Sequence, residues 1–524
     1  MCAADNATSS DNLPVVPDSD VPWCSIMPQF KITTLGCKVN QYDGQAIAQI
    51  LESAGFRPAE NRDQPPVDLV VVNTCCVTAT AMRKSRQTLR RAVRQAPGAA
   101  VLVAGCYGDY DAQRIRALLA ELNVPPDRLA FAGHHGHVAE QVRRFARHVH
   151  RDRRRTTEPR AQRRDTRAGL RGDDVWMSAS RDARIIASPE SIRTRRQAAV
   201  KDQATGAAGL GPIERFAGHQ RAFVKVQDGC DAFCAYCIVP YTRPNVRSRP
   251  AEEVLRECRN LVAAGHKEIV LCGVFLGAYG RPTTIRRRWG TEPSPLGDLV
   301  RAVAGIEGLW RVRLSSIEPG DVTDALLDVL DSTPAVAPHL HLPLQSGSAR
   351  ILRRMNRQYT ADEYRHMVDR VHSALDRPAI TTDVIVGFPG EGDEDFAATL
   401  DVARFAGFAK IHAFPFSAVE GTAAWTYRDE APAPGVVKAR MTELAELEDR
   451  LAETYRRQFV GRTMEGLVEA AGHGATNRRA MTDRYLTVTF PRPAGQADDD
   501  LTGQVVRLRI DEVTAHGLAG TILA

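Results

Sequence analysis

Three cysteines within eight residues, Cys230, Cys234 and Cys237, limit what this 524-residue chain can fold into more than any other feature. Soft thiolate ligands favour iron–sulfur clusters or zinc. The C-x3-C-x2-C spacing supplies three thiolates for a four-iron cluster and differs from the four-cysteine run of ferredoxins, so one iron would keep an open position. A structural zinc ion is the alternative. Zinc would need a fourth cysteine or histidine, which the loop lacks and only a distant residue could supply.

An iron with an open position can chelate the amino and carboxylate groups of S-adenosylmethionine. Reduction of that pair breaks a carbon–sulfur bond and yields an adenosyl radical, which is chemistry that the cofactor brings and the protein positions. The stretch resembles the radical S-adenosylmethionine signature, including the aromatic Tyr236 before the last cysteine.

The length of the chain predicts about three domains. Its composition predicts a reducing compartment. The chain shows no basic start followed by an apolar run and no membrane-length segment, so we expect a cytoplasmic protein without a membrane partner. Eleven cysteines then indicate metal ligands rather than disulfides. The net charge of +6 is accounted for by residues 151–172, where nine arginines face three acidic residues.

Residues 28–150 alternate short apolar runs with helical patterns, which predicts an open, mostly parallel α/β domain. A cysteine follows each expected strand: Cys37 after 30–35, Cys75 after 68–72 and Cys106 after 100–104. Parallel strands end on one edge of a sheet, where ligands gather, so these thiolates would converge into a second cluster site. The alternative is that each is a buried apolar residue. Cys76 complicates the triplet, but Cys75 is the better placed of the two.

Residues 216–435 repeat the rhythm, with expected strands at 222–227, 268–271, 312–315, 339–342, 380–386 and 410–414. Six βα units predict a partial (β/α)6 barrel open on one side, with its active site at the carboxyl ends of the strands. Residues 281–294 are expected to be a loop insertion. Residues 1–27 should be a disordered lead-in. Residues 151–215 should be an Arg-rich linker that is either solvated or binds nucleic acid.

After a connecting helix at 436–458, residues 459–524 contain short strands typical of a small β-barrel. Its balance is slightly acidic, so any RNA contact would have to come from one-sided placement of Arg462, Arg478, Arg479 and Arg484. The helix at 79–95 offers a second basic face for phosphates, or simply a solvated surface.

The chain resembles the radical S-adenosylmethionine methylthiotransferases from residue 28 to 524, apart from the linker and the insertion. The segments that carry the resemblance are Leu35–Asp43 (LGCKVNQYD), Asn73–Cys75, Gly105–Tyr107, Gly229–Pro240, Ser315–Pro319, His341–Gly347 and Asp383–Glu391. The sequence departs from the family pattern at Cys76, Cys272 and Pro244.

The resemblance implies two [4Fe-4S] clusters, one on Cys37, Cys75 and Cys106 and one on Cys230, Cys234 and Cys237, together with S-adenosylmethionine. It places Tyr236, Gly273, Glu318 and Gln345 around that cofactor and makes the C-terminal part similar to the TRAM RNA-binding module. One S-adenosylmethionine would methylate sulfur at the auxiliary cluster, and another would yield the radical. The implied partners are a tRNA anticodon stem-loop and a flavodoxin- or ferredoxin-type electron donor.

The Gly-Cys-Lys-Val-Asn-Gln-Tyr-Asp segment is similar to the branch that modifies C2 of N6-threonylcarbamoyladenosine at position 37 of tRNA. The isopentenyladenosine branch more often carries Gly-Cys-Gln-Met-Asn, and the branch acting on an aspartate of ribosomal protein S12 carries Gly-Cys-Pro-Lys-Asn. Both branches stay open as alternatives, as does a non-catalytic RNA-binding protein with structural metal sites.

Overall fold

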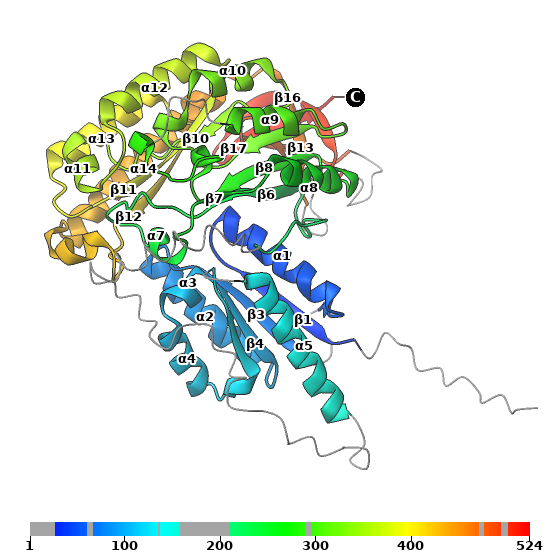
Figure 1. Cartoon of the computed structure of the whole chain (residues 1–524). Coiled ribbons are helices and arrows are strands. Elements are labelled where there is room, and N and C mark those ends of the chain that lie inside the picture. Colours follow the sequence, from blue (N-terminus) through cyan, green and yellow to red (C-terminus); the bar gives the residue numbers. More distant parts are fainter. Residues whose placement is uncertain are drawn as a thin grey trace, which may run out of the picture.

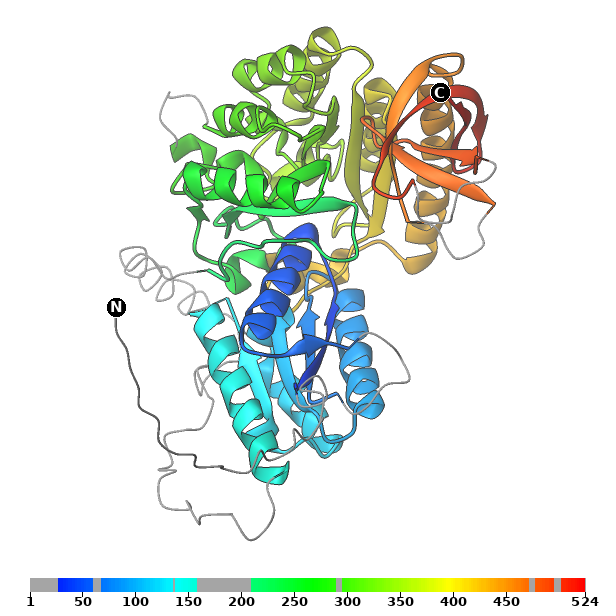
Figure 2. The same ribbon diagram turned by 90° about the vertical axis from the view of Figure 1, so that its right-hand side faces the viewer.

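The computed structural model describes residues 27–59, 67–134, 137–157, 209–288, 295–470, 476–493 and 501–523. Figure 1 shows an N-terminal domain in blue to cyan, a central barrel in green to yellow and a C-terminal module in orange to red. In the turned view of Figure 2, the N-terminal domain lies below the barrel and the C-terminal module beside it.

The N-terminal domain is built on a five-stranded sheet in the order β2-β1-β3-β4-β5, with every pairing parallel. A parallel sheet buries both of its faces, so its strands are apolar runs, and β3 and β4 are buried at every position. The strands are β1 (Gln29–Thr34), β2 (Arg57–Pro58), β3 (Leu69–Thr74), β4 (Ala100–Gly105) and β5 (Leu129–Ala132).

Helices cover both faces of this sheet. The helices α1 and α5 share a core with Leu69 and Val71 of β3, whereas α2 and α4 pack with Val70 and Val72 on the opposite face. Successive residues of a strand point to opposite faces, so one strand feeds both cores. The helices are α1 (Lys38–Ser53), α2 (Ala79–Gln95), α3 (Cys106–Tyr110), α4 (Ala112–Glu121) and α5 (Val138–Thr157).

The central part contains six parallel strands in two sheets, β6-β8-β9 and β10-β11-β12, with β7 antiparallel on the outer edge of β6. Bridges Val312–Val336 and Ser316–His341 join the two sheets. Among the described residues nothing pairs β6 with β12, so the barrel is open between them. The strands are β6 (Arg221–Asp228), β7 (Arg247–Ser248), β8 (Glu268–Gly273), β9 (Arg311–Leu314), β10 (His339–His341), β11 (Ala379–Val386) and β12 (Lys410–Pro415).

The barrel helices follow their strands in chain order and most of them lie on its outer side in Figure 1, whereas the short α7 (Val239–Thr242) lies at the junction with the N-terminal domain. The start and stop signals act as expected: α8 begins after Pro250 and ends just before Gly265. These helices are α7 (Val239–Thr242), α8 (Ala251–Ala263), α9 (Leu296–Ala304), α10 (Asp324–Ser332), α11 (Ala349–Arg354), α12 (Ala361–Ala374) and α13 (Asp393–Ala406).

The long helix α14 (Pro434–Arg457) leads into a closed five-stranded barrel in the order β13-β14-β15-β17-β16. Closure leaves no free sheet edge. Its pairings are antiparallel except β15 with β17. The strands are β13 (Thr463–Val468), β14 (Asn477–Thr482), β15 (Thr487–Pro491), β16 (Val505–Thr514) and β17 (Gly517–Ile522).

The C-terminal module is fixed to the amino-terminal ends of the barrel strands. Arg313, whose guanidinium is fully buried, donates to Glu268 Oε1 at 3.0 Å and to the carbonyl oxygens of Thr482 (3.0 Å) and Asp483 (2.8 Å). Its guanidinium also lies 4.3 Å from the centre of the Tyr485 ring. The β14–β15 turn therefore packs against the end of the barrel that lies opposite to the cysteine loop.

The expected fold class, an open parallel α/β domain followed by a partial (β/α)6 barrel and a small β-barrel, is confirmed. The strand β14 was not expected, because its sequence Asn-Arg-Arg-Ala-Met-Thr is polar at its start. None of the helices in the described ranges combines the length and the apolar character that crossing a membrane requires.

The segments expected to be a lead-in and a linker lie largely outside the described residues, as do residues 289–294 of the insertion. The described ends of the linker are structured. Helix α5 continues to Thr157, and residues 209–216 pack across α1 and α8, where Ile213 is buried and its amide donates to Glu257.

Candidate active site

The loop that carries Cys230, Cys234 and Cys237 begins at the carboxyl end of β6. Gly229 turns the chain with φ of +80°, and a Cβ there would lie 1.9 Å from the carbonyl oxygen of Asn245. Only glycine fits such a turn. Cys230 is buried, the other two are half-buried, and all three are free thiols.

The three thiols lie near one another in a low-dielectric setting. Burial raises the pKa of Cys230, and the charges of Cys234 and Cys237 raise it further. Burial also raises the pKa of Cys237 to about 12, with Cys234 adding to the shift. A bound iron would offset this cost, because its positive charge stabilises thiolates.

Residues from distant segments brace this loop. Arg357 donates to Cys234 Sγ and to the Tyr236 hydroxyl, both at 3.2 Å. Thr284, fully buried, donates to the Asp231 carboxylate at 2.6 Å and lies 3.6 Å from Cys230 Sγ. Thr284 belongs to the segment expected to be an insertion, so the described part of that segment contacts the site.

The second triplet lies where the carboxyl ends of β1, β3 and β4 meet. Cys37 is the N-cap of α1, Cys75 follows β3, and Cys106 opens α3. Burial raises the pKa of Cys75 to about 12, and the charges of Cys106 and Cys37 raise it as well. A Cβ on Gly36 (φ +100°) would lie 3.0 Å from Cys75 Sγ, so glycine lets the two loops meet. The structure therefore brings the three cysteines together.

Cys106 differs from its neighbours because its thiolate is stabilised. Its pKa lies well below its usual range, first because the Cys76 thiol donates a hydrogen bond to it, and then because Arg243 and His134 lie close by. Thiolates are the form that ligates metal. Cys76 thus contacts Cys106 from within the core, whereas Cys75 lies beside the loop that carries Cys37. This difference favours Cys75 over Cys76 as the candidate ligand.

The two triplets lie near one another at the junction of the domains, where Arg243 contacts Cys106 Sγ at 3.4 Å and the amide of Cys230 at 3.0 Å. The charge of Cys106 raises the pKa of Cys237, and the charge of Cys37 raises that of Cys272 in β8. Cys37 is accessible to solvent, yet desolvation by the surrounding protein raises its pKa. The accessibility and the desolvation are compatible, because solvent reaches Cys37 on one side while protein surrounds most of its side chain.

Among the described residues, no three His, Cys, Asp or Glu side chains converge closely enough to hold a single metal ion.

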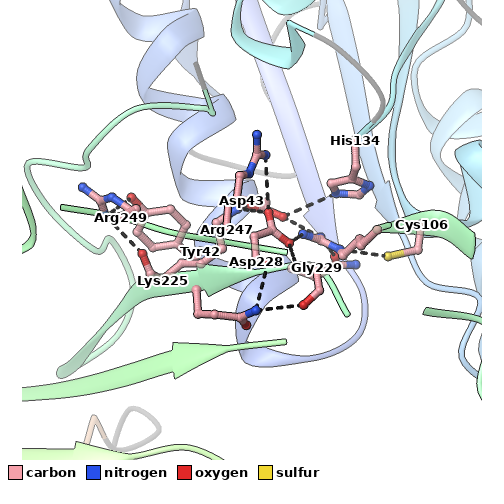
Figure 3. Close-up of polar contacts among 12 residues, drawn as sticks. Tyr42, Asp43, Cys106, His134, Lys225, Asp228, Gly229, Arg247 and Arg249 are labelled. Carbon is pink, nitrogen blue, oxygen red and sulfur yellow. Dashed lines mark hydrogen bonds and ion pairs between the residues drawn. The ribbon is translucent and has the colours of Figure 1, made fainter. Parts of the chain in front are cut away.

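A buried charge network joins the domains between the triplets (Figure 3). Asp43 of α1 pairs with Lys225 of β6 and, at 2.6 Å, with Arg243, which also pairs with Asp228 at 2.8 Å. Burial and Arg243 lower the pKa of His134, but the hydrogen bonds that its ring donates to the carboxylates of Asp109 and Asp43 outweigh them and raise it to about 9. Asp43 lies within the segment Leu35–Asp43, but sequence reasoning gave it no role and missed Arg243.

The residues expected around S-adenosylmethionine lie at the same end of the barrel. Glu318 receives two hydrogen bonds from Arg357, at 2.5 and 2.6 Å. Gln345 has φ of +60°, and its backbone pairs with β11 through Asp383 and Ile385. Tyr236 packs edge-on to Phe388. A Cβ on Gly273, the last residue of β8, would lie 3.0 Å from Gln227 Oε1, so close packing by Gln227 accounts for this glycine.

The basic residues expected to meet RNA divide into two groups. The expectation is wrong for Arg478, which is buried, and for Arg484, which donates to the carbonyl oxygens of Asp376 and Arg377. Arg462 and Arg479 remain exposed. Helix α2 contains no acidic residue, and its cations Arg83, Lys84, Arg91 and Arg94 are exposed.

The chain is similar to known protein families and to named proteins along most of its length. Residues 224–403 match the Radical SAM superfamily, and residues 29–124 match the family described as Uncharacterized protein family UPF0004. The threonylcarbamoyladenosine tRNA methylthiotransferase MtaB of Chlamydia pneumoniae is 34% identical over 495 residues, which cover 94% of this chain and 98% of that protein. MtaB of Bacillus subtilis is 33% identical over 482 residues, covering 91% and 92%.

A tRNA-2-methylthio-N(6)-dimethylallyladenosine synthase of Carboxydothermus hydrogenoformans is 31% identical over 505 residues, which cover 94% of this chain and 99% of that protein. Similarity at this level along nearly the whole of both chains extends over both cysteine triplets. The chain therefore belongs to the radical S-adenosylmethionine methylthiotransferase family and is an enzyme of that type rather than a non-catalytic RNA-binding protein.

Proposed function

We propose that this enzyme inserts a methylthio group at C2 of N6-threonylcarbamoyladenosine at position 37, beside the anticodon of tRNA. The relatives from Chlamydia pneumoniae and Bacillus subtilis carry this modification in their names. Relatives named for dimethylallyladenosine are nearly as similar, so overall identity does not separate the two substrates. The separation has to come from residues beside the reacting base.

The observation that carries the proposal is the ammonium group of Lys38, the residue after Cys37. Lys38 is half-buried, and within the described ranges its side chain has no ion pair or hydrogen bond. Its charge acts inside the barrel: burial is the main cause that lowers the pKa of His339, and the charges of Arg313 and Lys38 lower it further. An unpaired cation beside Cys37 suits the free carboxylate of a threonylcarbamoyl group, whereas a dimethylallyl group is a hydrocarbon.

We further propose that Cys230, Cys234 and Cys237 hold one [4Fe-4S] cluster and that Cys37, Cys75 and Cys106 hold a second. When bound, the first cluster with S-adenosylmethionine supplies the adenosyl radical, and the second supplies the sulfur. The chain's own residues would position the reaction: Arg243 contacts both Cys106 and the amide of Cys230, which supports placing the two clusters close enough to act on one base carbon. An unactivated C–H bond has no acidic proton for general-base catalysis, which is why radical chemistry is needed.

The exposed cations of α2 would contact tRNA phosphates, since phosphate contacts orient the nucleic acid and carry no sequence information. The target adenine would have to leave its stack to enter the site. Radical formation requires a low-potential electron, so we propose a flavodoxin- or ferredoxin-type donor and a cytoplasmic location, where tRNA is also found.

The test is nucleoside mass spectrometry of tRNA from a bacterial strain that lacks both methylthio modifications and expresses this protein. We expect 2-methylthio-N6-threonylcarbamoyladenosine in the wild type and none in a Cys230→Ala variant. Appearance of the 2-methylthio form of isopentenyladenosine instead would refute the substrate assignment. Methylthiolation of ribosomal protein S12 in the same cells would refute tRNA as substrate.

Lys38→Met tests the substrate contact directly. A hydrogen bond to a charged group contributes about 1.5–3 kcal/mol, so kcat/KM for the threonylcarbamoyl substrate should fall roughly 10- to 150-fold. Lys31→Met, which removes an exposed lysine of β1, should leave kcat/KM unchanged. Equal losses in both variants would show that Lys38 has no special role.

A further inference from the structure

We propose that Arg243 is a positioning residue that ties the two cysteine triplets to one another and stabilises negative charge on the sulfur of Cys106. The inference rests on the proposed cluster on Cys37, Cys75 and Cys106. It adds to that proposal a single side chain that couples the two sites.

Arg243 belongs to the barrel but reaches into the N-terminal domain. It lies six residues after Cys237, just beyond α7, and is buried. Its carbonyl oxygen accepts a hydrogen bond from the amide of Cys230 at 3.0 Å, and its Nε donates to Cys106 Sγ at 3.4 Å. One residue therefore contacts a cysteine of each triplet.

The remaining guanidinium donors hold Arg243 in one orientation. They contact Asp228 Oδ1 at 2.8 Å, Asp43 Oδ2 at 2.6 Å and Asn40 Oδ1 at 3.0 Å. Asp228 ends β6, while Asp43 and Asn40 lie in the first two turns of α1, which begins after Cys37. The rigid planar fork of arginine can satisfy these acceptors together, which the single ammonium of lysine cannot do.

Asn40 extends this connection to the rest of the N-terminal triplet. Its Nδ2 donates to the carbonyl oxygens of Leu35 and Thr74, both at 2.9 Å. Leu35 precedes Cys37 by two residues, and Thr74 directly precedes Cys75. All three loops of the N-terminal triplet are thus linked to Arg243, and through its carbonyl oxygen to the loop of the barrel triplet.

Two consequences follow for the loaded enzyme. Because the radical and the sulfur must reach the same carbon, a change in the separation of the sites would let the radical form without sulfur insertion. An N–H donor and a positive charge at a cluster thiolate favour the reduced, more negative cluster and raise its reduction potential.

Arg357 provides a matched control on the other triplet. It is another arginine with a buried guanidinium, and it donates to Cys234 Sγ at 3.2 Å. Among the described residues, its hydrogen bonds and ion pair are all made within the barrel, where Glu318 is its ion-pair partner. Substitutions at Arg243 and Arg357 should therefore affect different clusters.

The experiment uses full-length protein reconstituted anaerobically with iron and sulfide, in two backgrounds. Alanine at Cys230, Cys234 and Cys237 leaves the N-terminal cluster, and alanine at Cys37, Cys75 and Cys106 leaves the barrel cluster. Redox titration followed by electron paramagnetic resonance then gives each potential. We expect Arg243→Gln to disfavour reduction of the N-terminal cluster at least tenfold, a negative shift of ~59 mV for one electron, and to leave the barrel cluster unchanged. Arg357→Gln should show the reverse pattern.

Coupling is measured in the enzyme with both clusters as the ratio of 5′-deoxyadenosine formed to methylthio product formed. Arg243→Lys keeps the charge but not the fork, so its N-terminal potential should stay near that of the wild type while the ratio rises at least tenfold. An unchanged potential in Arg243→Gln, or a wild-type ratio in Arg243→Lys, would overturn the inference. If Arg243→Gln does not retain iron, the ratio of 5′-deoxyadenosine to methylthio product in Arg243→Lys becomes the deciding measurement for the inference.

Failure of the proposed cluster is seen separately. If the protein without the barrel cysteines takes up no iron although Arg243 is intact, the assignment of the second cluster is wrong. If it takes up iron and the Arg243 substitutions change neither potential nor ratio, the cluster assignment stands and the role of Arg243 falls.

Discussion

Replacing the buried carboxyl of Asp321 by an amide should stabilise the protein, and more so at high pH. Asp321 lies in a 3-10 turn at Pro319–Asp321 near the barrel loop and is 4% exposed. Neither carboxyl oxygen has a hydrogen-bond partner among the described residues, and Arg286 lies 3.8 Å away. Burial raises the pKa of Asp321 to about 7, although Arg286 opposes the shift.

The sign follows from proton linkage. The carboxyl ionises near its ordinary value of 3.8 in the unfolded chain and near 7 in the folded one. Between those values the folded state binds more protons, so stability falls as pH rises and levels off above 7. At ~1.4 kcal/mol per pKa unit, Asp321 costs about 2 kcal/mol at pH 5.5, where it must take up a proton on folding, and about 4 kcal/mol at pH 8.5, where it is buried in its ionised form. Asp321→Asn removes this cost.

The assay is anaerobic denaturant unfolding of wild type and Asp321→Asn, each at pH 5.5 and pH 8.5. The stabilisation by Asp321→Asn should be about 2 kcal/mol larger at pH 8.5. Asp331→Asn, which removes an exposed carboxyl in the last turn of α10, controls for a general effect of charge removal and should give the same change at both pH values. A stabilisation by Asp321→Asn that is equal at both pH values, or larger at pH 5.5, would refute the reasoning.

Three further predictions concern the cysteines and the barrel junction. Cys75→Ala should lower the iron bound per chain to about that of one cluster, because clusters require thiolates, whereas Cys76→Ala should keep nearly all of the iron. Iron and sulfide analysis after reconstitution distinguishes the two variants. Loss of iron in both would assign Cys76 an equal role. Cys76→Ala should also raise the pKa of Cys106 in the metal-free protein, since the Cys76 thiol is its largest stabilising contact, which the pH dependence of thiol alkylation measures. Arg313→Met should cost about 3–5 kcal/mol by leaving Glu268 with only the 3.4 Å contact from Arg311, and hydrogen exchange at the β14–β15 turn should rise more than at β3; equal exchange at both would contradict the role of Arg313 as an anchor.

The elements that sequence reasoning found are those whose signals are local. Helix α2 matches its expected range, and the six barrel strands lie close to theirs, because apolar periodicity and caps act within a few residues. The rule that parallel strands end at one edge was enough to expect Cys37, Cys75 and Cys106 together. The strand β14 was not predicted, because its pairing with neighbouring strands, rather than its own residues, makes it a strand.

The amino-acid sequence by itself determined the two cysteine triplets, the order of the three folded parts and the family to which the chain belongs, since these depend on local periodicity and on short segments. Only the tertiary structure decided what lies between the triplets. Asp43 and Arg243 are 200 residues apart in the chain, and Arg357 is 123 residues from Cys234. A buried ion pair at such separation depends on how whole domains pack, and no local pattern in the sequence specifies it.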